Sequence, residues 1–223
     1  MGIFSTLFGR RSDRAGQIGR HASPEKLLTE EQLVNEIRDE HIVRNEVADS
    51  FQVKVDQGLR FGSDAHRRLT AETNAAIQRL GDKKGKAAAE LIARGAPAVE
   101  QIVAALLAFA RSRQWHVRSV SRHDLDWQVR RGVGEDVGDV LAAIGDERAG
   151  RLLVAGLKDS DEDVRVTAAH ALRSLRDPRT VGALVGALAD HSKNVSIVVK
   201  SALEAVGGPE ADASLASHSA KGP

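Results

Sequence analysis

Residues 146–175 read DERAGRLLVAGLKDSDEDVRVTAAHALRSL, and residues 177–206 read DPRTVGALVGALADHSKNVSIVVKSALEAV. The second stretch lies on the first with a shift of 31 residues and no gap. The matched pairs are Asp146 with Asp177, Arg148 with Arg179, Leu153 with Leu184, Val154 with Val185, Leu157 with Leu188, Asp159 with Asp190, Val164 with Val195, Ala171 with Ala202 and Leu172 with Leu203. This number of matches in one register indicates a tandem repeat.

Each unit reads as a helix, a short acidic turn and a second helix. Apolar residues recur three and four positions apart over residues 148–158 and again over residues 164–175, which predicts two amphipathic helices. The aspartates of the turn DSDED, residues 159–163, can accept the first N–H groups of the second helix and interact favourably with its dipole. A helix pair of this size cannot bury its apolar face alone. We therefore predict an all-α fold, an α-solenoid of stacked helix pairs.

These motifs resemble the HEAT repeat, in particular the short bacterial kind known as the phycobilisome-lyase HEAT-like repeat. The resemblance rests on Gly145-Asp146 before the first helix, on the turn pattern Asp-x-Asp-x-x-Val-Arg at residues 159–165 and on Ala-Ala-x-Ala-Leu at residues 168–172. Residues 95–99 match the Gly-x-Pro-Ala-Val opening of another unit. The resemblance covers about residues 83–208 and implies a HEAT-like solenoid. This type of repeat is found in adaptors, scaffolds and a few enzymes.

Composition narrows the functional classes. The 223 residues contain 42% apolar but only 3% aromatic residues, which predicts a core of small aliphatic side chains. There is no cysteine, which excludes a disulfide scaffold and a thiolate metal site and favours a reducing cytoplasm. The net charge of +1 predicts no general attraction to nucleic acid or anionic membranes. No apolar run approaches the about 20 residues needed to cross a bilayer, and no signal peptide is visible.

Sequence motifs for catalysis and metal binding are missing. The chain has no Gly-rich phosphate loop, no nucleophile elbow and no HExxH pattern. His116 and His123 are seven residues apart, which is not a known zinc-ligand spacing. We therefore predict no cofactor, no metal and no enzymatic activity. A bilin lyase or isomerase subunit, which the repeat type suggests by name alone, stays open as an alternative.

An insertion interrupts the first repeat. The openings at Gly95 and Gly145 are 50 residues apart, 19 more than the period. We place the insertion at residues 109–123, FARSRQWHVRSVSRH, before a second copy of the turn pattern at residues 124–130, with the remaining four residues lengthening the helix that ends at Ile144. The competing alignment puts all 19 residues in the turn.

The inserted residues carry a local charge of +4, because their four arginines have no acidic neighbour. Guanidinium groups bind carboxylates and phosphates, and a tryptophan offers a stacking surface. We predict that partner binding involves Arg111, Arg113, Trp115, His116, Arg118, Arg122 and Trp127. Three interpretations stay open: an acidic protein partner, nucleic acid, or a loop in which Trp115 and Val117 pack as extra core.

Two further surfaces follow from the repeats. The second helix of the 146–175 unit is expected to turn Arg165, His170 and Arg173 toward the concave face, as a recognition strip or as solvated surface. Residues 209–223 are small and polar, which predicts a disordered tail. Ile197, Val198 and Val199 would then form an apolar contact site at the C-terminal end, for self-association or for a partner.

Residues 25–82 are predicted to form a helical N-terminal cap on the solenoid. Thr29 and Gln32 make a capping box before a long amphipathic helix. Gly58 and Gly62 end this helix, and Ser63 caps a second helix that reaches Leu80. His41 within the apolar stripe has the character of a satisfied packing residue and not of a ligand.

Residues 1–24 are predicted to be an amphipathic segment followed by a flexible linker. The apolar side chains are Ile3, Phe4, Leu7 and Phe8, with Arg10 and Arg11 behind them. Such a segment is a tether for a membrane surface or for a groove on a partner, and a frayed terminus is the alternative. We therefore predict a cytoplasmic protein, which is peripheral at the membrane if this segment binds a membrane surface.

The function predicted from the sequence is a non-enzymatic adaptor that binds another protein through the repeat surface and the basic insertion. The nucleic-acid alternative differs in one measurable way, because binding through arginine contacts to phosphates weakens steeply with salt.

Overall fold

The computed structural model describes residues 28–56, 58, 60–112 and 122–220, and for residues 47–53, 55, 56, 122–126 and 220 it describes the backbone only. Within these ranges the chain is helical and contains no strand. The helices are α2 (Glu30–Asp56), α3 (Asp64–Arg94), α4 (Val99–Ser112), α5 (Arg122–Ile144), α6 (Arg148–Gly156), α7 (Glu162–Leu175), α8 (Val181–Ala187), α9 (Lys193–Val206) and α10 (Pro209–Ala220), with 3-10 turns at Ala96–Ala98 and Pro178–Thr180.

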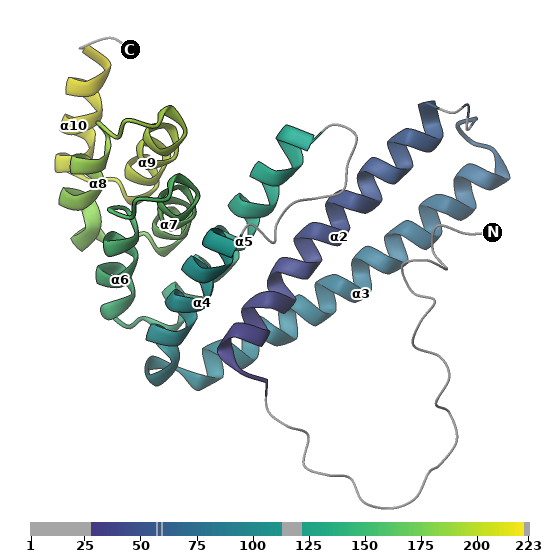
Figure 1. Ribbon diagram of the computed structural model, residues 1–223, viewed down its shortest axis with the longest axis horizontal. Helices are drawn as coiled ribbons and strands as arrows, with labels where there is room; N and C mark the ends of the chain where they lie inside the picture. The colour runs from purple at the N-terminus through teal and green to yellow at the C-terminus, as the bar shows by residue number, and fades with distance from the viewer. Residues whose placement is uncertain (1–27, 57, 59, 113–121, 221–223) are drawn as a thin grey trace, which may run out of the picture.

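The helices from α4 onward stack as a two-layered solenoid, which confirms the predicted all-α fold (Figure 1). One layer contains α5, α7 and α9, which pack side by side, and the other contains α4, α6, α8 and α10. A continuous core runs between the layers and is built from aliphatic side chains such as Leu106, Leu141, Leu153, Leu172 and Leu203, all fully buried.

The long helices α2 and α3 form an antiparallel hairpin that covers the first helix pair (Figure 1). α2 begins with the predicted capping box, because the Thr29 N–H donates to the Gln32 side chain over 2.8 Å and the Gln32 N–H donates to Thr29 Oγ1 over 3.2 Å. Leu33, Val34 and Ile37 then bury the apolar face of α2 against α4 and α5. The predicted cap of α3 is also confirmed, since the His66 N–H donates to Ser63 Oγ.

α5 and α7 approach one another closely through glycine. A Cβ at Gly138 would lie 2.5 Å from the Ala171 carbonyl oxygen, and one at Gly134 would lie 2.8 Å from the His170 Cβ. Only hydrogen fits at these positions. The glycines therefore allow two helix backbones to meet, and residues 164–172 of α7 are buried on every side.

The predicted boundary between cap and repeats at residue 82 is wrong. α3 does not end near Leu80 but continues to Arg94, through Gly81 and Gly85. A glycine costs a helix about 1 kcal/mol. The burial of Ala87 and Leu91 further along α3 holds the helix together past these positions.

The limits of the basic insertion also need correction. Phe109 and Ala110 are buried within α4, so this helix continues to Ser112 instead of ending at an inserted loop. The turn predicted at residues 124–126 is helical, because α5 begins at Arg122. Both helices of the first pair are thus longer than their counterparts α6 and α7, and α5 ends at Ile144 as predicted.

The C-terminal tail was predicted to be disordered, but residues 209–220 form α10. Ala211 is fully buried and Leu215 packs against the core, since small side chains let α10 lie on α8 and α9. The predicted apolar contact site is wrong for Val198 and Val199, which are 5% and 0% exposed. Of these three residues, only Ile197 is exposed, at 57%.

None of the described helices is by itself long and apolar enough to cross a membrane. A bent pair, Asp64–Arg94 with Ala96–Ser112, meets that test by length and composition alone.

Candidate functional site

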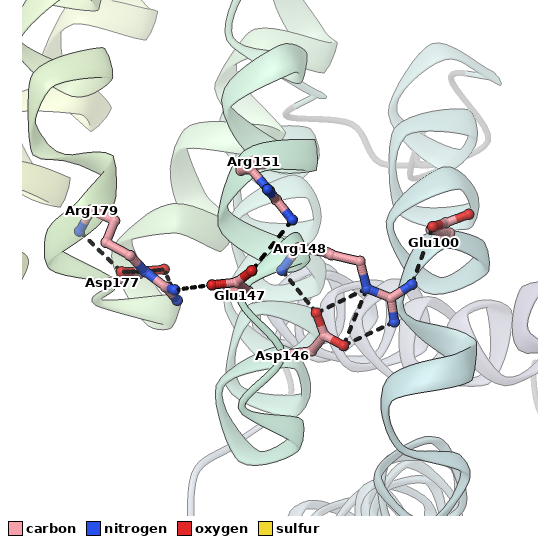
Figure 2. A network of polar contacts seen from close by, with 7 residues as sticks. All are labelled: Glu100, Asp146, Glu147, Arg148, Arg151, Asp177 and Arg179. Carbon is pink, nitrogen blue, oxygen red and sulfur yellow. Dashed lines mark hydrogen bonds and ion pairs between the residues drawn. The ribbon is translucent and has the colours of Figure 1, made fainter.

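A network of ion pairs joins successive units at the starts of α4, α6 and α8; we call it the inter-unit ladder (Figure 2). In the units that begin at α6 and α8, an arginine folds back on the aspartate two residues before it, and its guanidinium then reaches the preceding unit. The Arg148 guanidinium holds Asp146 over 2.8 Å and donates to Glu100 over 3.2 Å, and its repeat equivalent Arg179 holds Asp177 over 2.8 Å and donates to Glu147 over 2.9 Å. Arg151 pairs with Glu147 from the other side.

The ladder stabilises the charged form of its two aspartates. Hydrogen bonds from the Arg148 side chain and backbone N–H lower the pKa of Asp146 to about 2, and the Arg179 side chain lowers the pKa of Asp177 in the same way. Each acceptor already has donors from within the chain. The ladder therefore fixes how the units stack, because its contacts join one unit to the next.

Arg165 does not point outward as predicted, because it is buried between α7 and α9 at 3% exposure. Its Nε lies 2.9 Å from Asp190, its Nη1 donates to the carbonyl oxygens of residues 159 and 160, and its Nη2 contacts Asp190 and His191. Every side-chain nitrogen is thus used to hold one unit against the next.

His170 was also predicted to face outward, but it is 2% exposed, beneath the edge of Trp127 at a ring-centroid distance of 6.2 Å. Desolvation, followed by the positive charges of Arg131, Arg173 and Arg130, lowers the pKa of His170 to about 3. Neither ring nitrogen has a hydrogen-bond partner in the part of the chain that the structure describes. The prediction failed because α5 approaches α7 so closely at Gly134 that no open face remains there. Arg173 is half-buried and donates to Glu135.

A groove of about 320 Å³ opens between α2 and α5. We call it the α2–α5 groove, and its lining residues are His41, Arg44, Asn45, Trp127, Gln128, Arg131 and Gly132. Trp127 is 40% exposed, and the Arg131 guanidinium carbon lies 5.3 Å from the centroid of its ring. A large aromatic surface and two arginines therefore share one concave site.

The groove presents hydrogen-bond donors. Arg44 uses Nε and Nη2 on Glu40, and Arg131 uses Nε on Glu135 over 2.9 Å. Within the described ranges, Arg44 Nη1, both terminal nitrogens of Arg131 and Trp127 Nε1 have no hydrogen-bond partner. No carboxylate is among the described residues that line the groove.

A partly buried polar cluster lies beside the groove. His41 Nε2 lies 2.7 Å from Asp136, which confirms His41 as a satisfied packing residue, and Lys84 reaches both Asp136 and Glu40. Burial alone would raise the pKa of Asp136, but the hydrogen bonds and charges of His41 and Lys84 lower it below the usual value. Gly132 admits the His41 ring, since a Cβ there would lie 2.3 Å from it.

The predicted partner-binding residues are not gathered in one place. Trp127 lines the groove, whereas Arg111 pairs with Asp159 at the end of α4. Arg113, Trp115, His116, Arg118 and the tether residues Ile3, Phe4, Leu7 and Phe8 lie outside the described residues, as does the side chain of Arg122. The sequence reasoning missed Arg44 and Asn45, although their spacing from His41 on one helix face was a usable signal.

Residues 119–207 and 150–223 match the family model of HEAT repeats. The two matches together span residues 119–223, which include the helices from α5 to α10. The narrower assignment to the phycobilisome-lyase type stays a prediction. No curated protein matches the chain in a sequence comparison. HEAT repeats are commonly protein-interaction modules. In this chain the helices from α5 onward stack on one another as such repeats do.

Proposed function

We propose that this chain is a non-enzymatic adaptor of the cytoplasm that binds an acidic protein partner. The binding surface comprises the first HEAT unit with Trp127 and the basic segment that precedes α5. The observation that carries the proposal is the exposed Trp127 beside Arg131, because tryptophan and arginine dominate the energetics of protein interfaces. A rigid stack of helix pairs presents such a surface at little cost in conformational entropy.

An affinity capture from native lysate tests this function. The intact protein is compared with a variant in which Arg113, Trp115 and Arg118 are replaced by serine, and bound proteins are quantified by mass spectrometry. These substitutions avoid Phe109 and Arg111, which the structure places in the core and in an ion pair. We expect a partner that the intact protein retains and the variant loses.

A control at an exposed arginine outside this surface tests for general basicity, with one positive charge removed against two in the triple variant. Arg151→Ser removes an exposed arginine of the inter-unit ladder, and we expect it to retain the same partner. Captured proteins that are identical for the intact chain and the triple variant would contradict the part assigned to the basic segment. The absence of any protein above a bead control would contradict the adaptor function itself.

A further inference from the structure

We propose that the α2–α5 groove binds a carboxylate side chain from an acidic segment of the partner protein, held between Arg44 and Arg131 and resting against Trp127. This inference rests on the proposed adaptor function and names the chemistry that the partner must supply. Neither Arg44 nor the other α2 residues belong to the surface predicted from the sequence.

The first argument is the surplus of donors. Arg44 and Arg131 each keep guanidinium N–H groups without a partner in the described part of the chain, and both line the same groove. An arginine elsewhere in the fold, Arg165, uses all of its side-chain nitrogens. A guanidinium fork matches the two oxygens of a carboxylate, so the unused N–H groups fit this ligand in geometry and charge.

The second argument concerns net charge. Glu40, Glu135 and Asp136 lie behind the groove and offset Arg44, Arg131 and Lys84. The charges of these six groups cancel, so the capacity to bind an anion comes from the unused guanidinium N–H groups. A carboxylate with one negative charge suits this balance better than a nucleic-acid backbone, which needs an extended basic surface.

The third argument is that the groove is held in shape before any ligand arrives. His41 is fixed by Asp136 and seated on Gly132, and Trp127 forms a T-shaped ring pair with the buried His170. Glu40 and Glu135 fix the Nε sides of the two guanidinium groups. Binding then immobilises few additional side chains.

Tryptophan fluorescence tests the inference on the full chain. Trp115→Phe leaves Trp127 as the sole tryptophan. The probe is acetylated hexaglutamate amide, with the hexaglutamine peptide as its uncharged control. We expect a saturable change in Trp127 emission with hexaglutamate and none with hexaglutamine. Arg44→Gln and Arg131→Gln, each in this background, should raise the Kd about tenfold, which corresponds to one charge-assisted hydrogen bond.

Arg151→Gln is the matched control, because Arg151 is also an exposed arginine paired with a glutamate four residues away. Its Kd should stay within about twofold of the parent value, and circular dichroism should show all variants folded. Equal Kd values for the parent, Arg44→Gln and Arg131→Gln would overturn the inference, as would equal binding of hexaglutamine or no response at all.

A parallel titration with oligothymidylate distinguishes a nucleic-acid ligand from an acidic protein segment. Tighter binding of the oligonucleotide than of hexaglutamate, with a loss of about 10³-fold between about 50 and 200 mM salt, would overturn the inference in favour of a nucleic-acid ligand. The groove assignment and the adaptor function can be contradicted by different results. If hexaglutamate does not bind but the capture experiment still yields a partner lost by the triple variant, the groove assignment is wrong and the adaptor stands.

Discussion

Arg165 and Arg131 belong to successive helices of one layer, yet the chain uses them in opposite ways. Arg165, between α7 and α9, is 3% exposed and donates from every nitrogen to Asp190, to His191 or to backbone carbonyl oxygens. Among the described residues, Arg131, on α5, donates through Nε to Glu135, and its other nitrogens lie at the α2–α5 groove without a partner. Between the regular units α7 and α9, every Arg165 donor thus has an acceptor. At the α2–α5 groove, where α2 takes the place of a preceding unit, guanidinium N–H groups have no hydrogen-bond partner among the described residues.

The largest expected effect comes from Arg165→Ala, which removes one member of a buried ion pair. The substitution leaves Asp190, whose side chain is 10% exposed, without its guanidinium partner, and we expect a loss of about 3 kcal/mol in the free energy of unfolding. Urea denaturation followed by circular dichroism measures it. Arg131→Gln is the comparison variant, for which we expect a loss of about 0.5 kcal/mol or less, since its ion pair is partly exposed. Similar losses of unfolding free energy for the two variants would contradict the distinction between the structural role of Arg165 and the exposed position of Arg131.

The next effect is a pH dependence caused by His170. Its pKa in the folded protein is lowered to about 3, so the unfolded chain, with an ordinary histidine pKa of about 6.5, binds the proton more readily. Stability is therefore complete above the unfolded pKa and falls as the pH decreases below it. Between pH 7.5 and pH 5 this group should account for a loss of about 2 kcal/mol.

The measurement is urea unfolding of the parent and of His170→Leu at several pH values. The variant should show a shallower decline over this window, whereas His218→Gln, an exposed site on α10, should behave like the parent. A decline of equal slope in His170→Leu and the parent would show that His170 is not the group responsible.

A smaller effect is expected where α5 meets α7. Gly138→Ala places a Cβ 2.5 Å from the backbone oxygen of Ala171, and we expect a loss of about 1–2 kcal/mol in unfolding free energy as the helices separate. The matched control is Gly186→Ala in α8, where no atom lies within 4 Å and where the better helix propensity of alanine should add about 0.5–1 kcal/mol. Thermal unfolding of both variants should show shifts of opposite sign. A gain in both would mean that the close approach does not hold α5 to α7.

The repeat pattern was sufficient to predict much of the fold. Apolar spacing and the 31-residue shift predicted α6 to α9, and capping residues predicted the starts of α2 and α3, because these features depend on short-range periodicity and hydrogen bonding. The errors arose where tertiary packing decides. α10 forms because α8 and α9 offer a surface for Ala211, which composition alone does not reveal.

The candidate site was less accessible from the sequence. Arg165 and His170 look like surface residues on a helical wheel, and only the approach of α5 through Gly134 and the position of Asp190 show that they are buried. The α2–α5 groove joins residues about 85 positions apart in the chain, which no local pattern connects. Trp127 was predicted as a binding residue from its type and its basic neighbours, and its exposure in the groove agrees with that role without testing it.

Site-specific photo-crosslinking tests the central claim, partner binding at the first unit, most directly. A benzoylphenylalanine at Gln128, an exposed position in the groove, is compared with one at Arg151 on the inter-unit ladder, and both proteins are irradiated in native lysate. The account predicts a protein adduct from position 128 that is absent from position 151 and is reduced by excess hexaglutamate. No adduct at position 128, or the same adduct from both positions, would contradict it.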